Sequence, residues 1–283
     1  MNSHIIPAFV FRWSKETSIT GYLRNGENPR RRLQDGLKVP LLCSSCEGML
    51  NEWETRFATE IFHPYNANSS LRAAYGDWML KFCVSVSWRV LKYMADKHPL
   101  DDWSEQQRAA AVGALERWRA FMFGEVPHPG PYEQNLLPLS VMSSSTIPNM
   151  PTNMNRYLAR GLDMDVAHGE RTAFTYSKMG KLALFGMVVP SAARWRGARV
   201  SVRSGVIQPG HFEVPHHLAD YLMDRARGSA KLQQMIPERQ NEKIEEVFMR
   251  DLDRVANTDQ FKAMLADAEM FGVDAVIRKP SGE

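Results

Sequence analysis

Residues 41–57 read LLCSSCEGMLNEWETRF and place Cys43 and Cys46 at the Cys-x-x-Cys spacing of a zinc knuckle. A structural zinc ion takes four ligands, usually from two such pairs. The only other cysteine, Cys83, lies in the apolar run FCVSVSW and is expected in the core. The segment is therefore half of a zinc site or a pair of small buried side chains. A thioredoxin-type redox pair is not favoured, because no βαβ pattern surrounds it.

The same segment predicts an amphipathic helix from Cys46 to Phe62. At 100° per residue, one face of this helix is apolar and another is acidic. We expect His63-Pro64 to end it, because the residue before a proline disfavours the helical region. The apolar face holds Met49, Leu50, Trp53, Phe57 and Ile61; the acidic face holds Glu47 and Glu54.

Upstream of the cysteine pair lies Ser3-His4-Ile5-Ile6-Pro7. Taken with LLCSSCE, this motif resembles the HNH endonuclease family, whose fold is a ββα-metal, treble-clef arrangement. The resemblance implies that His4 is the general base that activates a water. It also implies that Ser3 stands where the family has Asp, and that Glu47 stands where it has Asn or His.

The resemblance implies two kinds of metal. A divalent Mg²⁺ or Mn²⁺ ion would be held at Glu47, with Glu54 as a further oxygen ligand. The two glutamates are seven residues apart, or roughly 10 Å along a helix, so they cannot chelate one ion directly. Zinc would be bound by Cys43 and Cys46, with His63 or another chain completing the ligands, because only two residues precede Ser3 and the family's first knuckle is expected to be missing.

The expected function is therefore metal-dependent cleavage of DNA or RNA, with a role in bacterial defence against phage or mobile DNA. The alternative is a non-catalytic binding or assembly protein built on a degenerate HNH fold, acting as a homo-oligomer or with a partner protein. If these residues have no catalytic role, Glu47 and Glu54 belong to the solvated face of a helix, and His4 is structural.

A basic run, Arg30 to Arg32, precedes the cysteine pair. Such runs are usually solvated loops, but in an HNH protein this one would meet the phosphate backbone. The whole chain carries 35 basic and 32 acidic side chains, a net charge of +3, which alone does not indicate a nucleic-acid partner. Further candidates for phosphate contact are Arg12, Lys15 and Arg24.

The rest of the chain predicts an α+β, mostly helical fold in four consecutive parts. These are an HNH-like segment (1–65), a helical core (66–125), a Pro-rich connecting loop (126–170), and an antiparallel sheet with C-terminal helices (171–283). Strands are expected in 172–189, around a turn at 178–180, and in 198–207. Helices are expected at 72–97, at 104–123 with a Ser104–Gln107 capping box, at 215–227 and 237–256, and from an N-cap at Thr258 to Gly272.

Composition and targeting signals favour a folded, cytoplasmic protein. Hydrophobic residues make up 44% of the chain, and no apolar run reaches the roughly 18 residues of a spanning helix. The N-terminus lacks the basic region and cleavage site of a signal peptide. We therefore expect no membrane association.

Overall fold

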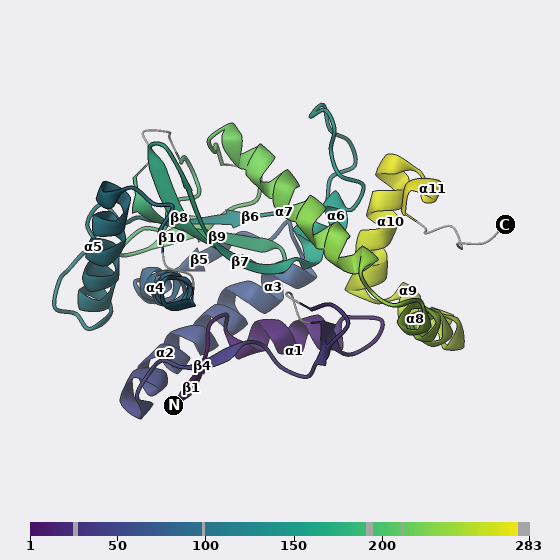
Figure 1. Cartoon of the computed structure of the whole chain (residues 1–283), viewed down its shortest axis with the longest axis horizontal. Helices are drawn as coiled ribbons and strands as arrows, with labels where there is room; N and C mark the ends of the chain where they lie inside the picture. The colour runs from purple at the N-terminus through teal and green to yellow at the C-terminus, as the bar shows by residue number, and fades with distance from the viewer. Residues whose placement is uncertain (25–27, 98–99, 191–194, 211, 277–283) are drawn as a thin grey trace. The chain divides into compact units, whose positions relative to one another are not determined.

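The computed structural model describes residues 1–24, 28–97, 100–190, 195–210 and 212–276. Its class is α+β and mostly helical, which confirms the predicted fold class (Figure 1). The chain forms two compact units, and each unit is assembled from three separate segments, unlike the four consecutive parts described above. Unit 1 contains 1–8, 36–139 and 162–215; unit 2 contains 9–35, 140–161 and 216–283.

Unit 1 is built on a four-stranded antiparallel sheet of order β6-β9-β8-β7. The predicted hairpin is confirmed as β8 (Thr172–Met179) and β9 (Leu182–Val189). Gly180 in the turn has a φ of +58°, which glycine adopts readily. The strands β6 (Gln134–Pro138) and β7 (Leu162–Gly169) complete the sheet.

These two outer strands correct the prediction of a connecting loop over 126–170. All five residues of β6 are buried, although the segment is rich in proline and polar side chains. Proline is tolerated here because β6 is an edge strand of the sheet and Pro138 is its last residue.

The prediction of a strand over 198–207 is also largely wrong. Only β10 (Gly205–Ile207) is a strand, and it pairs with β5 (Ala73–Tyr75) in a separate two-stranded sheet. The preceding residues instead follow the free edge of β6, through backbone hydrogen bonds from Leu136 to Ala198 and from Val200 to Gln134. The alternating sequence of 198–207 therefore forms two short pairings, one with β6 and one with β5, rather than one long strand.

Two long helices form the helical core of unit 1. The helix α4 (Trp78–Lys97) packs against the sheet and buries most of its apolar residues, including Cys83 as predicted (Figure 1). It begins at Trp78 rather than at residue 72, because residues 73–75 pair with β10. The helix α5 (Glu105–Met122) begins with the predicted capping box, in which the Ser104 and Gln107 side chains each bond to the other's backbone.

The segment that follows the cysteine pair is helical from end to end. α2 (Ser44–Arg56) runs into a π-helical stretch, η1 (Phe57–Phe62), and then into α3 (His63–Ala67). The predicted end at His63-Pro64 is therefore wrong, because Pro64 sits in the first turn of α3, where its missing N–H costs little. On the predicted apolar face, Leu50, Trp53, Phe57 and Ile61 are buried, and the Phe57 ring stacks on Phe82 of α4 with centroids 3.8 Å apart.

Unit 2 is mainly helical. Its N-terminal part contains the helix α1 (Ala8–Glu16), of which the first residue belongs to unit 1. It also contains two short paired strands, β2 (Leu23–Arg24) and β3 (Arg32–Leu33). The predicted caps Thr258 and Gly272 bound α10 (Asp259–Phe271). The other helices are α6 (Met154–Arg160), α7 (His217–Gln234), α8 (Glu238–Arg250), α9 (Leu252–Ala256) and α11 (Val273–Val276).

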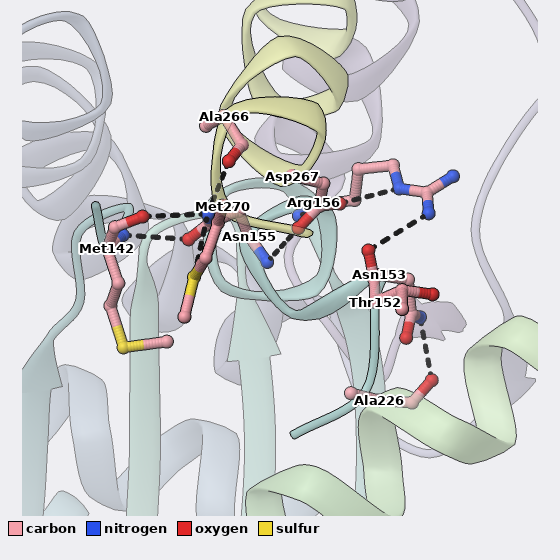
Figure 2. Close-up of polar contacts among 9 residues, drawn as sticks. All are labelled: Met142, Thr152, Asn153, Asn155, Arg156, Ala226, Ala266, Asp267 and Met270. Carbon is pink, nitrogen blue, oxygen red and sulfur yellow. Dashed lines mark hydrogen bonds and ion pairs between the residues drawn. The ribbon is translucent and has the colours of Figure 1, made fainter. Parts of the chain in front are cut away.

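A buried polar network holds the helices of unit 2 together (Figure 2). The Asp267 carboxylate on α10 accepts hydrogen bonds from the backbone N–H of Asn155 at 2.7 Å and from Nε of Arg156 at 2.7 Å. The Asn155 side chain bonds to both backbone groups of Met142, and Asn153 donates to the Ala226 carbonyl of α7. Because Asn153, Asn155 and Asp267 are buried, these bonds satisfy side-chain polar atoms that water hardly reaches.

Among the helices of the described ranges, none combines the length and the apolar character needed to cross a membrane.

Candidate functional site

The N-terminal strand and the helix after the cysteine pair meet in a ββα arrangement. The strand β1 (Asn2–His4) pairs antiparallel with β4 (Lys38–Pro40), and α2 begins four residues after β4. Further backbone bonds, from Leu41 to Met1 and from Ile5 to Leu37, extend the pairing beyond both strands. Two segments far apart in sequence are thereby fixed side by side in unit 1.

This pairing brings Ser3 and Glu47 into direct contact. Ser3 is fully buried, and its Oγ donates a hydrogen bond of 2.7 Å to Oε2 of Glu47 in the first turn of α2. His4, the next residue, ends β1 and is half-buried. The structure therefore places a hydroxyl and a carboxylate in contact near the end of β1, and His4 follows Ser3 as the last residue of that strand.

Arg89 on α4 links the same strand to the same helix. Its Nη1 lies 2.9 Å from the His4 carbonyl oxygen and 2.7 Å from Oε1 of Glu54 on α2. The Arg89 side chain is only 2% exposed, so its charge is largely removed from water and is compensated by Glu54. Arg89 thus holds the backbone of His4 in place.

Arg89 was not among the site residues predicted from the sequence. A signal was nevertheless present, because Arg89 interrupts the apolar row of a helix that is otherwise buried, three residues after Val86. A charged side chain at such a position needs a buried partner of opposite charge.

A hollow of about 260 Å³ lies along one face of α2. Both Glu47 and Glu54 line it, together with Asn51 of the same helix and Met1 of the N-terminus. Gly48, also in the lining, has no other atoms within 4 Å of the position that a Cβ would take, so the helix surface is open there. The hollow therefore has a mixed lining, in which the carboxylates of Glu47 and Glu54 lie beside the apolar side chains of Met1 and Leu50.

The two cysteines lie close together at the start of α2. Cys43 is the N-cap residue, and its Sγ is 3.1 Å from Sγ of Cys46 and 3.1 Å from Oγ of Ser45. Hydrogen bonding with the Ser45 hydroxyl and with the Cys46 thiol lowers the pKa of Cys43 to about 6. The bond with Cys43 raises the pKa of Cys46, and burial raises that of Cys83.

The other predicted metal ligands are not brought to one point. His63 is exposed at the start of α3, 17 residues after Cys46 on a continuous helical run, or on the order of 25 Å along the axis. Glu54 is occupied by Arg89. In the part of the chain that the structure describes, no group of three or more His, Cys, Asp or Glu side chains could hold a metal ion.

The six basic residues predicted to contact phosphates all belong to unit 2. Three of them make internal contacts: Lys15 with the Gln34 carbonyl, Arg24 with the Pro29 carbonyl and Gln240, and Arg32 with the Tyr22 ring. Partial burial lowers the pKa of Arg24. The remaining three, Arg12, Arg30 and Arg31, have exposed side chains.

Comparisons with protein-family models, with curated proteins and with solved structures give no match for this chain.

Proposed function

We propose that the chain is a metal-dependent endonuclease of the HNH type that hydrolyses phosphodiester bonds in DNA or RNA. The observation that carries the proposal is the 2.7 Å hydrogen bond between Ser3 and Glu47. These residues stand at the two positions where the family resemblance expects metal-holding side chains. The bond joins the end of β1 to the first turn of α2, as a ββα nuclease site requires.

His4 is the general base in this proposal. It takes a proton from a water molecule that then attacks phosphorus, and histidine is the residue that most often performs such a proton transfer in enzymes. His4 is half-buried, so a water molecule can reach it while the strand keeps its backbone fixed. Arg89 supports this position through the His4 carbonyl.

The carboxylate of Glu47, which lines the hollow, suits a hard cation such as Mg²⁺ or Mn²⁺, and the buried Ser3 hydroxyl would orient that carboxylate through its hydrogen bond. Mg²⁺ usually keeps several waters and takes one or two protein carboxylates plus substrate phosphate, so a small protein ligand set suffices. When bound, such an ion would stabilise the negative charge that develops on the leaving oxygen. Zinc at Cys43 and Cys46 is a separate part of the proposal, and another chain would supply the missing ligands.

Phosphate contacts are assigned to Arg12, Lys15, Arg24 and Arg30 to Arg32. A guanidinium group can form bidentate hydrogen bonds with phosphate oxygens. Arg30 and Arg31 are exposed, so we favour them as the main phosphate contacts. A role in bacterial defence against phage or mobile DNA completes the proposal and rests on the family resemblance alone.

A non-catalytic binding or assembly protein is the second candidate. Two observations favour it: Glu54 is held by Arg89, and α8 buries none of its residues. Ile244, Val247 and Phe248 form an apolar row on α8 and are only half-buried. An amphipathic helix of this kind suits a partner protein or a second copy.

Cleavage of supercoiled plasmid and of single-stranded RNA, with Mg²⁺ or Mn²⁺, tests the first candidate. We expect His4→Ala and Glu47→Gln to abolish cleavage, and His217→Ala, an exposed histidine on α7, to leave it unchanged. Ser3→Asp, which supplies the residue typical of the family, should lower the metal concentration needed for half-maximal cleavage. Unchanged cleavage by His4→Ala would exclude the nuclease, and a folded, inactive oligomer would favour the second candidate.

A further inference from the structure

The two thiols at the start of α2 are arranged for bond formation with each other. Their sulfur atoms are 3.1 Å apart, against about 2.05 Å in a disulfide, so roughly 1 Å of approach would close the bond. Cys43 is the N-cap residue with extended backbone angles, φ −80° and ψ 169°. It is therefore outside the rigid helix and is able to make this small movement.

We propose that Cys43 and Cys46 form a reversible dithiol–disulfide pair that exchanges with small organic disulfides such as glutathione disulfide. The proposal does not depend on His4 or Glu47, since neither sulfur takes part in activating water, but it is an alternative to the zinc proposed at these two cysteines. It assigns to this segment a thiol–disulfide exchange activity, which the sequence pattern alone did not favour.

The difference in solvent exposure between Cys43 and Cys46 sets the order in which their sulfur atoms react. Cys43 is exposed and Cys46 is half-buried, so an incoming disulfide meets Cys43 first. Cys46 lies one helical turn further on, where its sulfur faces Cys43 and can resolve the mixed disulfide. Cys83 is completely buried in α4 and serves as an internal thiol that should not react.

The exchange is balanced in two steps. The Cys43 thiolate attacks one sulfur of the small disulfide, which forms a mixed disulfide and releases one small thiolate. The Cys46 thiolate then attacks the Cys43 sulfur, which forms the Cys43–Cys46 bond and releases the second small thiolate. The two cysteine protons end on the two released thiols; the protein loses two electrons, and the small disulfide gains them.

Zinc capture is the competing fate of the same sulfurs. A zinc ion bound by the thiolates of two copies of the chain would block both steps, because a coordinated sulfur is a poor nucleophile for exchange. The experiment therefore begins with reduced, chelator-treated protein and is repeated after addition of zinc chloride alone.

Glutathione disulfide is added to the reduced full chain without oxygen, the reaction is quenched in acid, and remaining thiols are alkylated and mapped by mass spectrometry. We expect an internal disulfide between Cys43 and Cys46 and an unreacted Cys83. Cys46→Ser should accumulate a mixed disulfide at Cys43, whereas Cys43→Ser should react at least about tenfold more slowly. Ser44→Ala, which changes the same turn and keeps both sulfurs, is the matched control and should behave as the wild type.

Three results would overturn the proposal. The first is that both thiols of the wild type stay free for alkylation, and the second is that Cys43→Ser reacts as fast as Cys46→Ser. The third is that the protein still holds zinc after chelator treatment and resists exchange. Circular dichroism of each variant checks that α2 is still folded. Cys43 is exposed and Cys46 is half-buried in the first turn of the helix, so serine is expected to be accommodated at both positions.

Discussion

Arg89 and Glu54 form an ion pair in which Nη1 and Oε1 are 2.7 Å apart and the guanidinium is 2% exposed. The same nitrogen lies 2.9 Å from the His4 carbonyl oxygen, so one side chain joins α4, α2 and the end of β1. A second nitrogen of the same guanidinium, Nη2, is buried, and no residue that the structure describes accepts a hydrogen bond from it. The guanidinium also donates to the Ser85 carbonyl, so Glu54 supplies the negative charge among its partners and the two carbonyls supply neutral acceptors.

Glu54→Ala should lower the free energy of unfolding by about 3 kcal/mol, because it leaves the Arg89 charge buried without its partner. Glu60→Ala is the control. Glu60 pairs with Arg56 on the same helical run, but both side chains are at least 40% exposed, so the loss should be below about 0.5 kcal/mol. Urea unfolding of the two variants gives the comparison; equal losses would mean that Arg89 is stabilised by other groups.

Asp267→Ala should destabilise unit 2. The substitution removes the acceptor for the Asn155 and Arg156 backbone N–H groups and for the Arg156 guanidinium, which should cost about 3 kcal/mol in total. Glu269→Ala changes an exposed carboxylate on the same helix and should cost less than about 0.5 kcal/mol. Hydrogen exchange of the amides in α6 reports the effect locally, and unaltered protection there would contradict it.

The buried Lys178 should make stability depend on pH. Burial lowers its pKa to about 7, although the negative charge of Asp163 acts in the opposite direction. Between about pH 7 and the unfolded pKa of about 10.4, the unfolded chain binds more protons than the folded one. The free energy of unfolding should therefore rise with pH across this window, by at most about 1.4 kcal/mol per pH unit.

Lys178→Met removes this titration, and its pH profile should be flat by comparison over the same window. The side chain of Lys178 also donates to the Gly180 carbonyl, so part of the stability gained at pH 7 will be offset by the loss of that bond. Urea midpoints from pH 6.5 to 9.5 for both proteins give the measurement. Parallel profiles would show that Lys178 does not titrate in this range.

Arg30→Ala with Arg31→Ala should weaken binding of the chain to DNA or RNA and should make that binding less dependent on salt. Each lost phosphate contact lowers the slope of log K against log salt by about 0.7 to 0.9. Arg250→Ala, an exposed arginine at the end of α8, should leave the slope unchanged. Fluorescence anisotropy over a salt series checks this, and a double variant with the wild-type slope would remove both residues from the interface.

Local signals in the sequence predicted much of the helical structure. The Ser104–Gln107 capping box and the Thr258 and Gly272 caps are formed as expected, since such contacts join residues within a few positions. The apolar face of α2 was predicted correctly for the same reason, because it depends on residues three and four positions apart. β6 was missed because its partner β9 is over 40 residues away and its first two residues, Gln134 and Asn135, are polar although buried.

The candidate site could be predicted in part. The motif around His4 and the cysteine pair named Ser3 and Glu47, which lie in contact. No local pattern could show that Glu54 pairs with Arg89, because 35 positions separate them and the contact arises only when α4 packs against α2. The assigned roles of His4, Glu47, the cysteines and the arginines stay predictions until cleavage and binding are measured.

The assembly of unit 2 from three distant segments has a consequence for folding during synthesis. The backbone N–H of Ile19 bonds to the Gln260 side chain, and the Ile19 carbonyl accepts from Arg254. At roughly 5 to 20 residues per second, a ribosome needs about 10 to 50 s to travel between these positions. The backbone of Ile19 must therefore wait for these partners until the C-terminal helices emerge, and a chaperone could bind this part of the nascent chain during that interval.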